Sequence, residues 1–236
     1  MKKLTVVLMA VLAIVFTGCN KDKLITLSET SATLHHGQTY QIDAQCENPI
    51  TYASADEYHA MVSDAGLVTA NFIGNTTIEL QSEQDSKTFS VTVEPQSNLY
   101  SEPNISFGES KNSVISKLGT PAVEMDEGIG YLDYATAAMM MLVLFDENNC
   151  VEYYALIINP PYTDELNDTF LPERYNFFGY QDGLDIYINS LNYATTTMVV
   201  CSEEYEDGMW IVMYMADERQ SRPQDAINAL VKALQK

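Results

Sequence analysis

Residues 60–70 read AMVSDAGLVTA, and the same pattern continues as GNTTI at residues 74–78 and TFSVTV at residues 88–93. Apolar and polar residues alternate along these segments, which indicates strands with one buried face and one face in water. Asp64-Ala65-Gly66 supplies a turn between two of them, in which the glycine tolerates a positive φ. Several short strands separated by polar turns predict an all-β sandwich over residues 24–95.

The same segments resemble the bacterial Ig-like domain of the second group. Its pattern has an aromatic-x-Ser step, here Tyr52-Ala53-Ser54, a V-[DS]-x-x-G-x-V-T-A hairpin, a G-T-[AT]-x-I strand and a final V-T-V. The sequence departs from it at residues 56–59, DEYH, where the family usually has a shorter Ser-Asn-type loop. The resemblance implies an Ig-like sandwich but leaves function open, because such domains serve as spacers, adhesion modules and sugar-binding accessories.

The first 18 residues have the features of a secretory signal: Lys2 and Lys3, an apolar run at residues 4–16, and small residues after it. The run is shorter than the roughly 20 residues that span a bilayer. FTGC at residues 16–19 resembles the lipobox of bacterial lipoproteins, which implies a diacylglyceryl and palmitoyl anchor on Cys19 and a lipidated tether at residues 19–23. The alternative is an ordinary signal peptide with an incidental cysteine.

Charge limits the partners of the exported chain. Removal of residues 1–18 leaves ten basic and 33 acidic residues, a formal charge of −23. So acidic a surface repels phosphate backbones and anionic headgroups, which argues against nucleic-acid binding and against charge-driven membrane binding. We therefore expect a membrane contact through the lipid anchor alone, at the outer membrane of a Gram-negative envelope, with the surface and the periplasmic side both open.

A linker is predicted at residues 96–103, and an internal echo follows it in residues 104–236. YLDYATAAM at residues 131–139 returns 59 residues later as SLNYATTTM at residues 190–198. Each copy leads into two predicted strands, at 139–145 and 150–158 in the first and at 198–202 and 209–215 in the second. Helix candidates at 110–118 and 172–178 precede the copies and end at a glycine, and an amphipathic helix is predicted at 223–235. These patterns predict an α+β domain, with short helices packed on an antiparallel sheet and an internal duplication.

The first copy resembles the β-lactamase-inhibitor-protein-like module, a family that also includes small outer-membrane assembly lipoproteins. Its pattern is G-x-[ST]-x-x-x-V-x-x-x-L-G-x-P, then an aromatic-x-x-aromatic strand and a V-x-F-x-x-x-x-x-V hairpin. The positions that fit are Gly108, Ser110, Val114, Leu118, Gly119, Pro121, Tyr131, Tyr134, Val143, Phe145 and Val151. The second copy lacks the Leu-Gly-x-Pro signature. The resemblance implies binding of a protein on the sheet.

The sequence contains none of the common catalytic motifs, neither a nucleophile elbow nor a zinc-protease, P-loop or dinucleotide-binding pattern. His35, His36 and His59 are the only histidines. His35 and His36 precede the Gly37 turn and are typical of a solvated loop, with metal binding as the alternative. Acidic runs at residues 164–168 and 203–207 are typical of solvated turns; a carboxylate-based carbohydrate hydrolase and a Ca²⁺ site are the alternatives. We therefore predict a protein that is not an enzyme and that carries no metal or cofactor besides the lipid.

Aromatic residues crowd the second half of the chain, and they suit binding surfaces as well as strands. The predicted binding surface comprises Tyr162, Tyr180, Tyr205 and Trp210. Cys150 and Cys201 are candidates for a disulfide between the two hairpins. The sequence thus predicts a lipid-anchored binding or adhesion protein for an unknown protein or glycan. A periplasm-facing envelope-assembly lipoprotein is the second interpretation.

Overall fold

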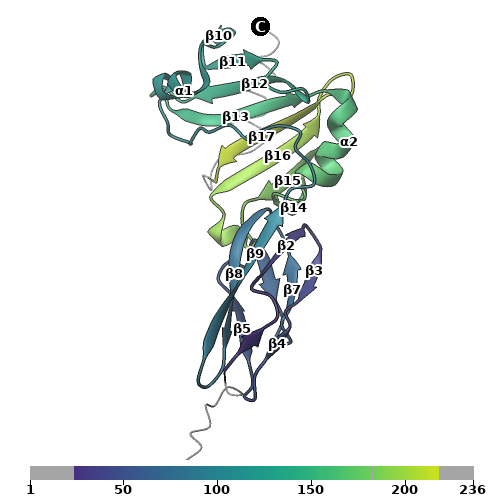
Figure 1. Ribbon diagram of the computed structural model, residues 1–236. Helices are drawn as coiled ribbons and strands as arrows, with labels where there is room; N and C mark the ends of the chain where they lie inside the picture. Colours follow the sequence, from purple (N-terminus) through teal and green to yellow (C-terminus); the bar gives the residue numbers. More distant parts are fainter. Residues whose placement is uncertain (1–23, 182, 218–236) are drawn as a thin grey trace, which may run out of the picture.

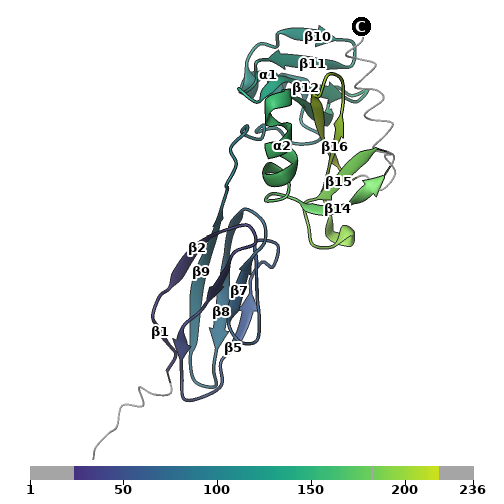
Figure 2. The same ribbon diagram turned by 90° about the vertical axis from the view of Figure 1, so that its right-hand side faces the viewer.

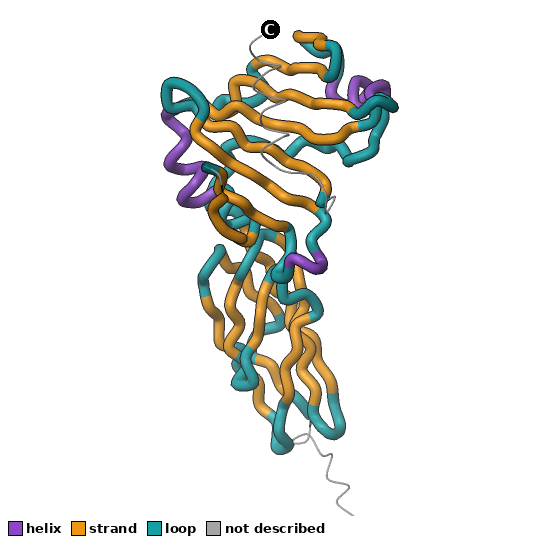
Figure 3. Tube along the Cα trace, turned by 180° about the vertical axis from the view of Figure 1, so that it is seen from behind, coloured by secondary structure: helices purple, strands orange, loops and turns teal. Residues whose placement is uncertain are grey.

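The computed structural model describes residues 24–181 and 183–217 and shows two β-rich regions joined by a short connection (Figure 1). The predicted signal peptide and Cys19 lie outside these residues, as does the helix predicted at residues 223–235. Strands dominate both regions, and the helices are few and short (Figure 3). The second region is therefore mostly β, and the α+β class predicted for it overstates the share of helix.

The first region is a sandwich of small sheets around one apolar core. A four-stranded sheet has the order β2-β9-β8-β5, a three-stranded sheet has the order β3-β7-β6, and β1 pairs with β4. The strands are β1 Thr26–Leu27, β2 Ser31–His35, β3 Thr39–Gln41, β4 Ala44–Gln45, β5 Thr51–Ser54, β6 Ala60–Val62, β7 Leu67–Ala70, β8 Gly74–Gln81 and β9 Ser86–Glu94. Alternate side chains of β8 and β9, such as Ile78, Leu80 and Phe89, fill the core. The predicted all-β sandwich is confirmed.

The predicted hairpin joins β6 to β7. Val62 pairs with Val68 across it, and the Ser63 amide donates to the Leu67 carbonyl at 3.0 Å. Gly66 has a φ of 76°, the left-handed conformation that the sequence pattern requires of a glycine here.

The second region is an eight-stranded antiparallel sheet of order β10-β11-β12-β13-β17-β16-β15-β14. Its strands are β10 Val123–Met125, β11 Gly128–Leu132, β12 Ala138–Phe145, β13 Val151–Ile158, β14 Asn176–Gln181, β15 Leu184–Ile188, β16 Met198–Glu204 and β17 Trp210–Ala216. The strands predicted in both copies are therefore present. The sequences of the central strands are nearly continuous apolar runs, because both faces of the sheet are buried.

The strand order divides the sheet into two four-stranded meanders that meet along β13 and β17. Residues 131–139 lead from β11 into β12, and their echo at residues 190–198 leads from β15 into β16. The 59-residue offset maps Tyr153 onto Val212 and Leu156 onto Met215. Tyr153 pairs with Met215 and Leu156 pairs with Val212, so the offset exchanges these two pairs across the join. A self-complementary join of this kind is what a two-fold relation produces. The topology agrees with the predicted duplication.

Of the two helices predicted within the described residues, the one at residues 110–118 is present and the one at residues 172–178 is wrong. Helix α1 spans Lys111–Leu118, with Ser110 as its N-cap and Gly119 after its last turn. The segment predicted as the second helix instead runs into β14 at Asn176. Its aromatic residues suit a strand, and the helical turns come earlier, as η2 Pro160–Tyr162, α2 Thr163–Glu165 and η3 Leu166–Phe170. A short helical turn, η4 Tyr193–Thr195, follows β15.

The two faces of the eight-stranded sheet are covered differently. On the front face, α1 and the helical turns at residues 160–170 lie on the same side of the sheet (Figure 2), and the connection adds Leu99 and Tyr100 to the same core. The other face, here called the back face, has a second buried cluster. It consists of Leu142, Leu144, Tyr153, Ala155, Ile157, Leu184, Ile188, Val199, Cys201, Ile211, Met213 and Met215.

Candidate functional site

The four aromatic residues predicted as one binding surface do not lie together. Tyr162 and Trp210 pack partly buried against the front-face core, whereas Tyr205 packs against the back-face cluster. Tyr180 is the exception, since it lies on β14 and is 71% exposed. The predicted surface is therefore wrong as a unit, because the sheet separates its members onto opposite faces.

The structure places a different group of aromatic side chains at the open edge of the sheet. Phe177 and Phe178 are 55% and 54% exposed on β14, beside Tyr180, and Tyr193 is exposed next to them. The rings of Phe178 and Tyr193 stack with their centroids 5.2 Å apart. We call Phe177, Phe178, Tyr180 and Tyr193 the aromatic edge. Exposed aromatic side chains in such a cluster mark interaction surfaces.

Backbone geometry explains why these side chains face water. Phe177 pairs with Tyr187 and Gly179 pairs with Ile186, so Phe178 is an extra residue opposite the β15 ladder. Such a bulge turns a side chain away from its alternating position. Within the described residues, β14 pairs with β15 alone, so one side of its backbone is open. The sequence signal for this edge is the run of aromatic residues before Gly179, which lies in the segment predicted as a helix.

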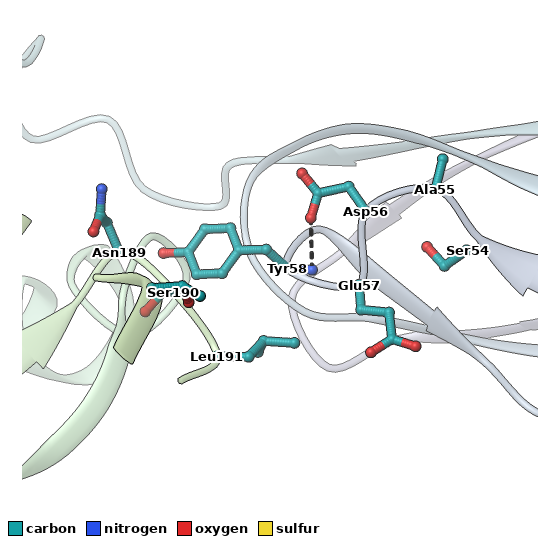
Figure 4. A pocket seen from close by; sticks show the side chains of 9 residues that line it. Ser54, Ala55, Asp56, Glu57, Tyr58, Asn189, Ser190 and Leu191 are labelled. Atoms are coloured by element: carbon teal, nitrogen blue, oxygen red, sulfur yellow. Dashed lines mark hydrogen bonds between the residues drawn. The ribbon is translucent and has the colours of Figure 1, made fainter. Parts of the chain in front are cut away.

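The loop at residues 56–59, where the sequence departs from the Ig-like pattern, contacts the second region. The Tyr58 hydroxyl donates to the Arg174 carbonyl at 2.7 Å, and burial raises the Tyr58 pKa well above its usual value. Tyr58 points from this loop toward the residues that follow β15 (Figure 4). Both sides line a cleft of about 480 Å³, formed by Ser54, Ala55, Asp56, Glu57, Tyr58, Asn189, Ser190, Leu191 and Thr195. The cleft thus continues toward the aromatic edge through Leu191, which is 43% exposed and lies two residues from Tyr193.

A buried carboxylate organises the junction between the two regions. Glu173 is 1% exposed, and its carboxylate accepts hydrogen bonds from the amides of Gln96 at 2.7 Å and Ser97 at 3.1 Å. Its carbonyl accepts from the Ile73 amide of the Ig-like region at 2.9 Å. Glu173, a residue of the second region, therefore forms hydrogen bonds with both the first region and the connection.

Arg174 completes this junction. Its Nη1 lies 2.6 Å from the Glu173 carboxylate, and its Nη2 donates to the Ser97 carbonyl at 2.9 Å. The guanidinium stacks over the Phe170 ring at 3.7 Å from the centroid. Since Leu99 and Tyr100 are also buried, the predicted linker is a packed connection and not a free tether.

The predicted disulfide between Cys150 and Cys201 is absent, and both thiols are free. Cys201 lies opposite Met213, which lies opposite Ala155, five residues along β13 from Cys150. Two strand spacings and five residues separate the cysteines by roughly 19 Å. A disulfide requires Cα atoms within about 7 Å. Cys150 lies directly before β13 and Cys201 lies within β16, so the fold keeps the two thiols apart.

Metal-binding chemistry has no support in the described part of the chain, where no group of three or more His, Cys, Asp or Glu residues is placed to hold an ion. Nδ1 of His35 bonds the Glu94 carbonyl at 3.0 Å, and Nδ1 of His36 bonds the Asn71 carbonyl. In the acidic run at residues 164–168, Glu165 accepts from the Ser97 hydroxyl at 2.7 Å, so that carboxylate belongs to the junction. Among the described residues, no helix has the length and apolar character needed to cross a membrane.

Comparison with known proteins supports the assignment of the first region. Residues 23–93 match the family model of the bacterial Ig-like domain (group 2). No curated protein matches the chain. Among solved structures, domains 4-9 of the surface layer protein SbsC cover 84% of this chain at 12% identity and a TM-score of 0.29, and this chain spans 27% of that structure. The match to domains 5-6 of SbsC covers 84% of this chain and 85% of that structure, with 11% identity and a TM-score of 0.28.

The match to human protocadherin-24 EC1-2 covers 81% of this chain and 94% of that structure, with 13% identity and a TM-score of 0.26. Scores of this size do not indicate a common fold for the whole chain. The family match and the observed sandwich agree with each other, and together they show that residues 23–93 are a bacterial Ig-like domain of group 2.

Proposed function

We propose that this chain is a lipid-anchored protein of the bacterial cell envelope that binds a protein partner without catalysis. The Ig-like domain serves as the stalk, and the eight-stranded sheet, interpreted as a β-lactamase-inhibitor-protein-like module, serves as the binding domain. The aromatic edge carries this proposal, since it combines exposed aromatic side chains with an open strand backbone. Natural sheets usually protect such edges with charges or proline.

The chemistry of the aromatic edge favours an extended segment of a partner protein. Such a segment adds to β14 through main-chain hydrogen bonds, and the aromatic rings supply contact area at a small cost in side-chain entropy. The formal charge of −23 favours partners with basic residues and disfavours nucleic acid. A glycan stacking on the same rings is the competing ligand class, and a glycan array distinguishes the two.

The test compares capture of envelope proteins by two variants of the complete mature chain. Replacing Phe177, Phe178 and Tyr180 with serine removes the exposed rings, and we expect partner capture to fall at least tenfold, about 1.4 kcal/mol of binding free energy. Leu132→Ser is the matched control, since Leu132 is 51% exposed on β11 near the opposite edge of the sheet. Undiminished capture by the triple variant, with its circular dichroism unchanged, contradicts the assignment.

The anchor is proposed from the sequence, because FTGC at residues 16–19 has the lipobox pattern. Two or three acyl chains hold a protein firmly to a bilayer, at about 0.8 kcal/mol per buried methylene. Labelled palmitate should enter the wild-type chain and not Cys19→Ser, which should leave the membrane fraction. Protease shaving of intact cells then tells a surface protein from a periplasmic one. Absence of label from the wild-type chain contradicts anchoring but leaves the aromatic edge untouched.

A further inference from the structure

The back face of the eight-stranded sheet is shielded from water, yet its cluster contains only residues of the sheet itself and of the turn at residues 205–209, among those the structure describes. Ala155, Cys201, Ile211 and Met213 are each 0% exposed. The front face differs, because its core includes Val114 of α1 and Leu166 and Phe170 of η3. A flat apolar face reaches such burial only when another element packs on it.

We propose that the C-terminal segment of this chain, residues 218–236, packs on the back face as an amphipathic helix and forms the third layer of the second region. The proposal commits to a segment of the same molecule as the occupant. It goes beyond the binding function proposed above and does not rest on it.

The sequence of this segment fits the face. Ala226, Ile227, Leu230, Val231 and Leu234 follow the spacing of one helix face, while Asp225, Asn228 and Lys232 lie on the other. A helix over residues 223–235 is about 20 Å long. The five strands that supply the back-face cluster span roughly 20 Å at about 4.8 Å per strand. Helix length and sheet width therefore match.

Chain connection also favours this occupant. Strand β17 supplies three residues of the cluster and ends at Ala216, and the Asp217 amide bonds the Thr197 carbonyl at 3.0 Å. The segment thus leaves the sheet beside the face that it is proposed to cover. Because the contact is intramolecular, it does not depend on protein concentration, unlike cover by a second copy of the chain.

Cys201 is a built-in reporter of this contact. It lies in the back-face cluster, and burial raises the pKa of its thiol to about 12, which keeps it protonated and unreactive at neutral pH. Cys150 lies in the turn before β13 and is only half-buried, so it reports on general reactivity in the same molecule. Peptide mass spectrometry after N-ethylmaleimide treatment measures both rates at once.

The experiment compares Leu230→Asp with Asn228→Asp in the complete mature chain. Both variants add one carboxylate, but only the first places it on the apolar side of the proposed helix. We expect Leu230→Asp to increase the rate of Cys201 modification on the order of tenfold or more, by opening the cover locally, and to leave Cys150 unchanged. Asn228→Asp should react like the wild type.

An unchanged Cys201 rate in folded Leu230→Asp overturns the proposal. So does protection of wild-type Cys201 that is lost on dilution together with dissociation of a dimer, because the occupant is then a second copy. If Leu230→Asp does not fold, hydrogen exchange of the wild-type chain decides. Slow exchange of the amides at residues 226–234 supports the helix, and exchange at the rate of an unstructured peptide overturns it.

Discussion

At the scale of single residues, Glu109 shows how one carboxylate fixes the start of a helix. It accepts from the Ser106 amide at 3.0 Å and from Lys117 Nζ at 2.8 Å, and the Ser113 hydroxyl also donates to it. The hydrogen bond from Lys117, then those from Ser113 and Ser106, lower the pKa of Glu109 to about 2. The carboxylate thereby links the turn before α1 to the last turn of the helix.

This lowered pKa predicts a dependence of stability on pH. Because the pKa is lower in the folded state, the ionised carboxylate stabilises the fold above its unfolded pKa, about 4.5, and the contribution is lost as pH falls toward 2. Glu109→Gln should therefore lower the melting temperature at pH 6 more than at pH 2.5. Melting curves at both values measure this, with Glu147→Gln in an exposed turn as the control. An equal decrease at both pH values contradicts the prediction.

At the scale of elements, a bulge changes the direction of side chains on β14, and Gly66 permits the tight turn between β6 and β7. Gly66 and Gly37 have nearly the same φ, 76° and 77°. A Cβ on Gly66 would lie 2.9 Å from Cζ of Tyr52, whereas a Cβ on Gly37 meets nothing within 4 Å. Tyr52 packs against the core of the sandwich, so the hairpin closes directly over a core side chain.

This pair of glycines gives a matched prediction. Alanine at either position costs about 1–2 kcal/mol for the left-handed backbone. Gly66→Ala should cost roughly 1 kcal/mol more than Gly37→Ala, because the Tyr52 ring must also move out of its packed position. Urea unfolding of the two variants measures the difference. Equal losses in the free energy of unfolding would contradict the prediction, because the Tyr52 ring would then move at no cost.

At the scale of the whole molecule, Glu173 and Arg174 set the position of the Ig-like domain relative to the eight-stranded sheet. They are neighbours in the sequence, and together they contact Ile73, Ser97 and Tyr58. The aromatic edge and the cleft lie beside this junction, since Asn189 and Leu191 line the cleft with Tyr58. A fixed junction therefore presents the aromatic edge in one orientation above the Ig-like domain.

Breaking the junction should separate the two domains. Glu173→Ala leaves Arg174 and two backbone amides without their acceptor, and we expect a loss of about 3 kcal/mol in the free energy of unfolding. Small-angle scattering should show a larger radius of gyration, because the domains then move independently. Glu147→Ala is the control for removal of an exposed carboxylate. A variant with wild-type stability and radius contradicts the role given to Glu173.

Elements with local signals can be predicted from the amino-acid sequence alone. The alternation and the Asp64-Ala65-Gly66 turn predicted the Ig-like hairpin, and Gly119 marked the end of α1. The 59-residue echo located equivalent strands in the two halves of the sheet. These features depend on neighbouring residues along the chain, so propensity, turn chemistry and periodicity are sufficient to find them.

Which side chains share a surface depends on the three-dimensional arrangement of the strands. Tyr205 in the turn before β17 and Trp210 at the start of β17 pack on opposite sides of the sheet although they are near in sequence. The aromatic edge depends on β14 being the last strand, and the junction depends on Glu173 meeting residues far along the chain. Strand order and burial arise from contacts between distant segments, because desolvation and pairing act through space and leave no local pattern in the sequence.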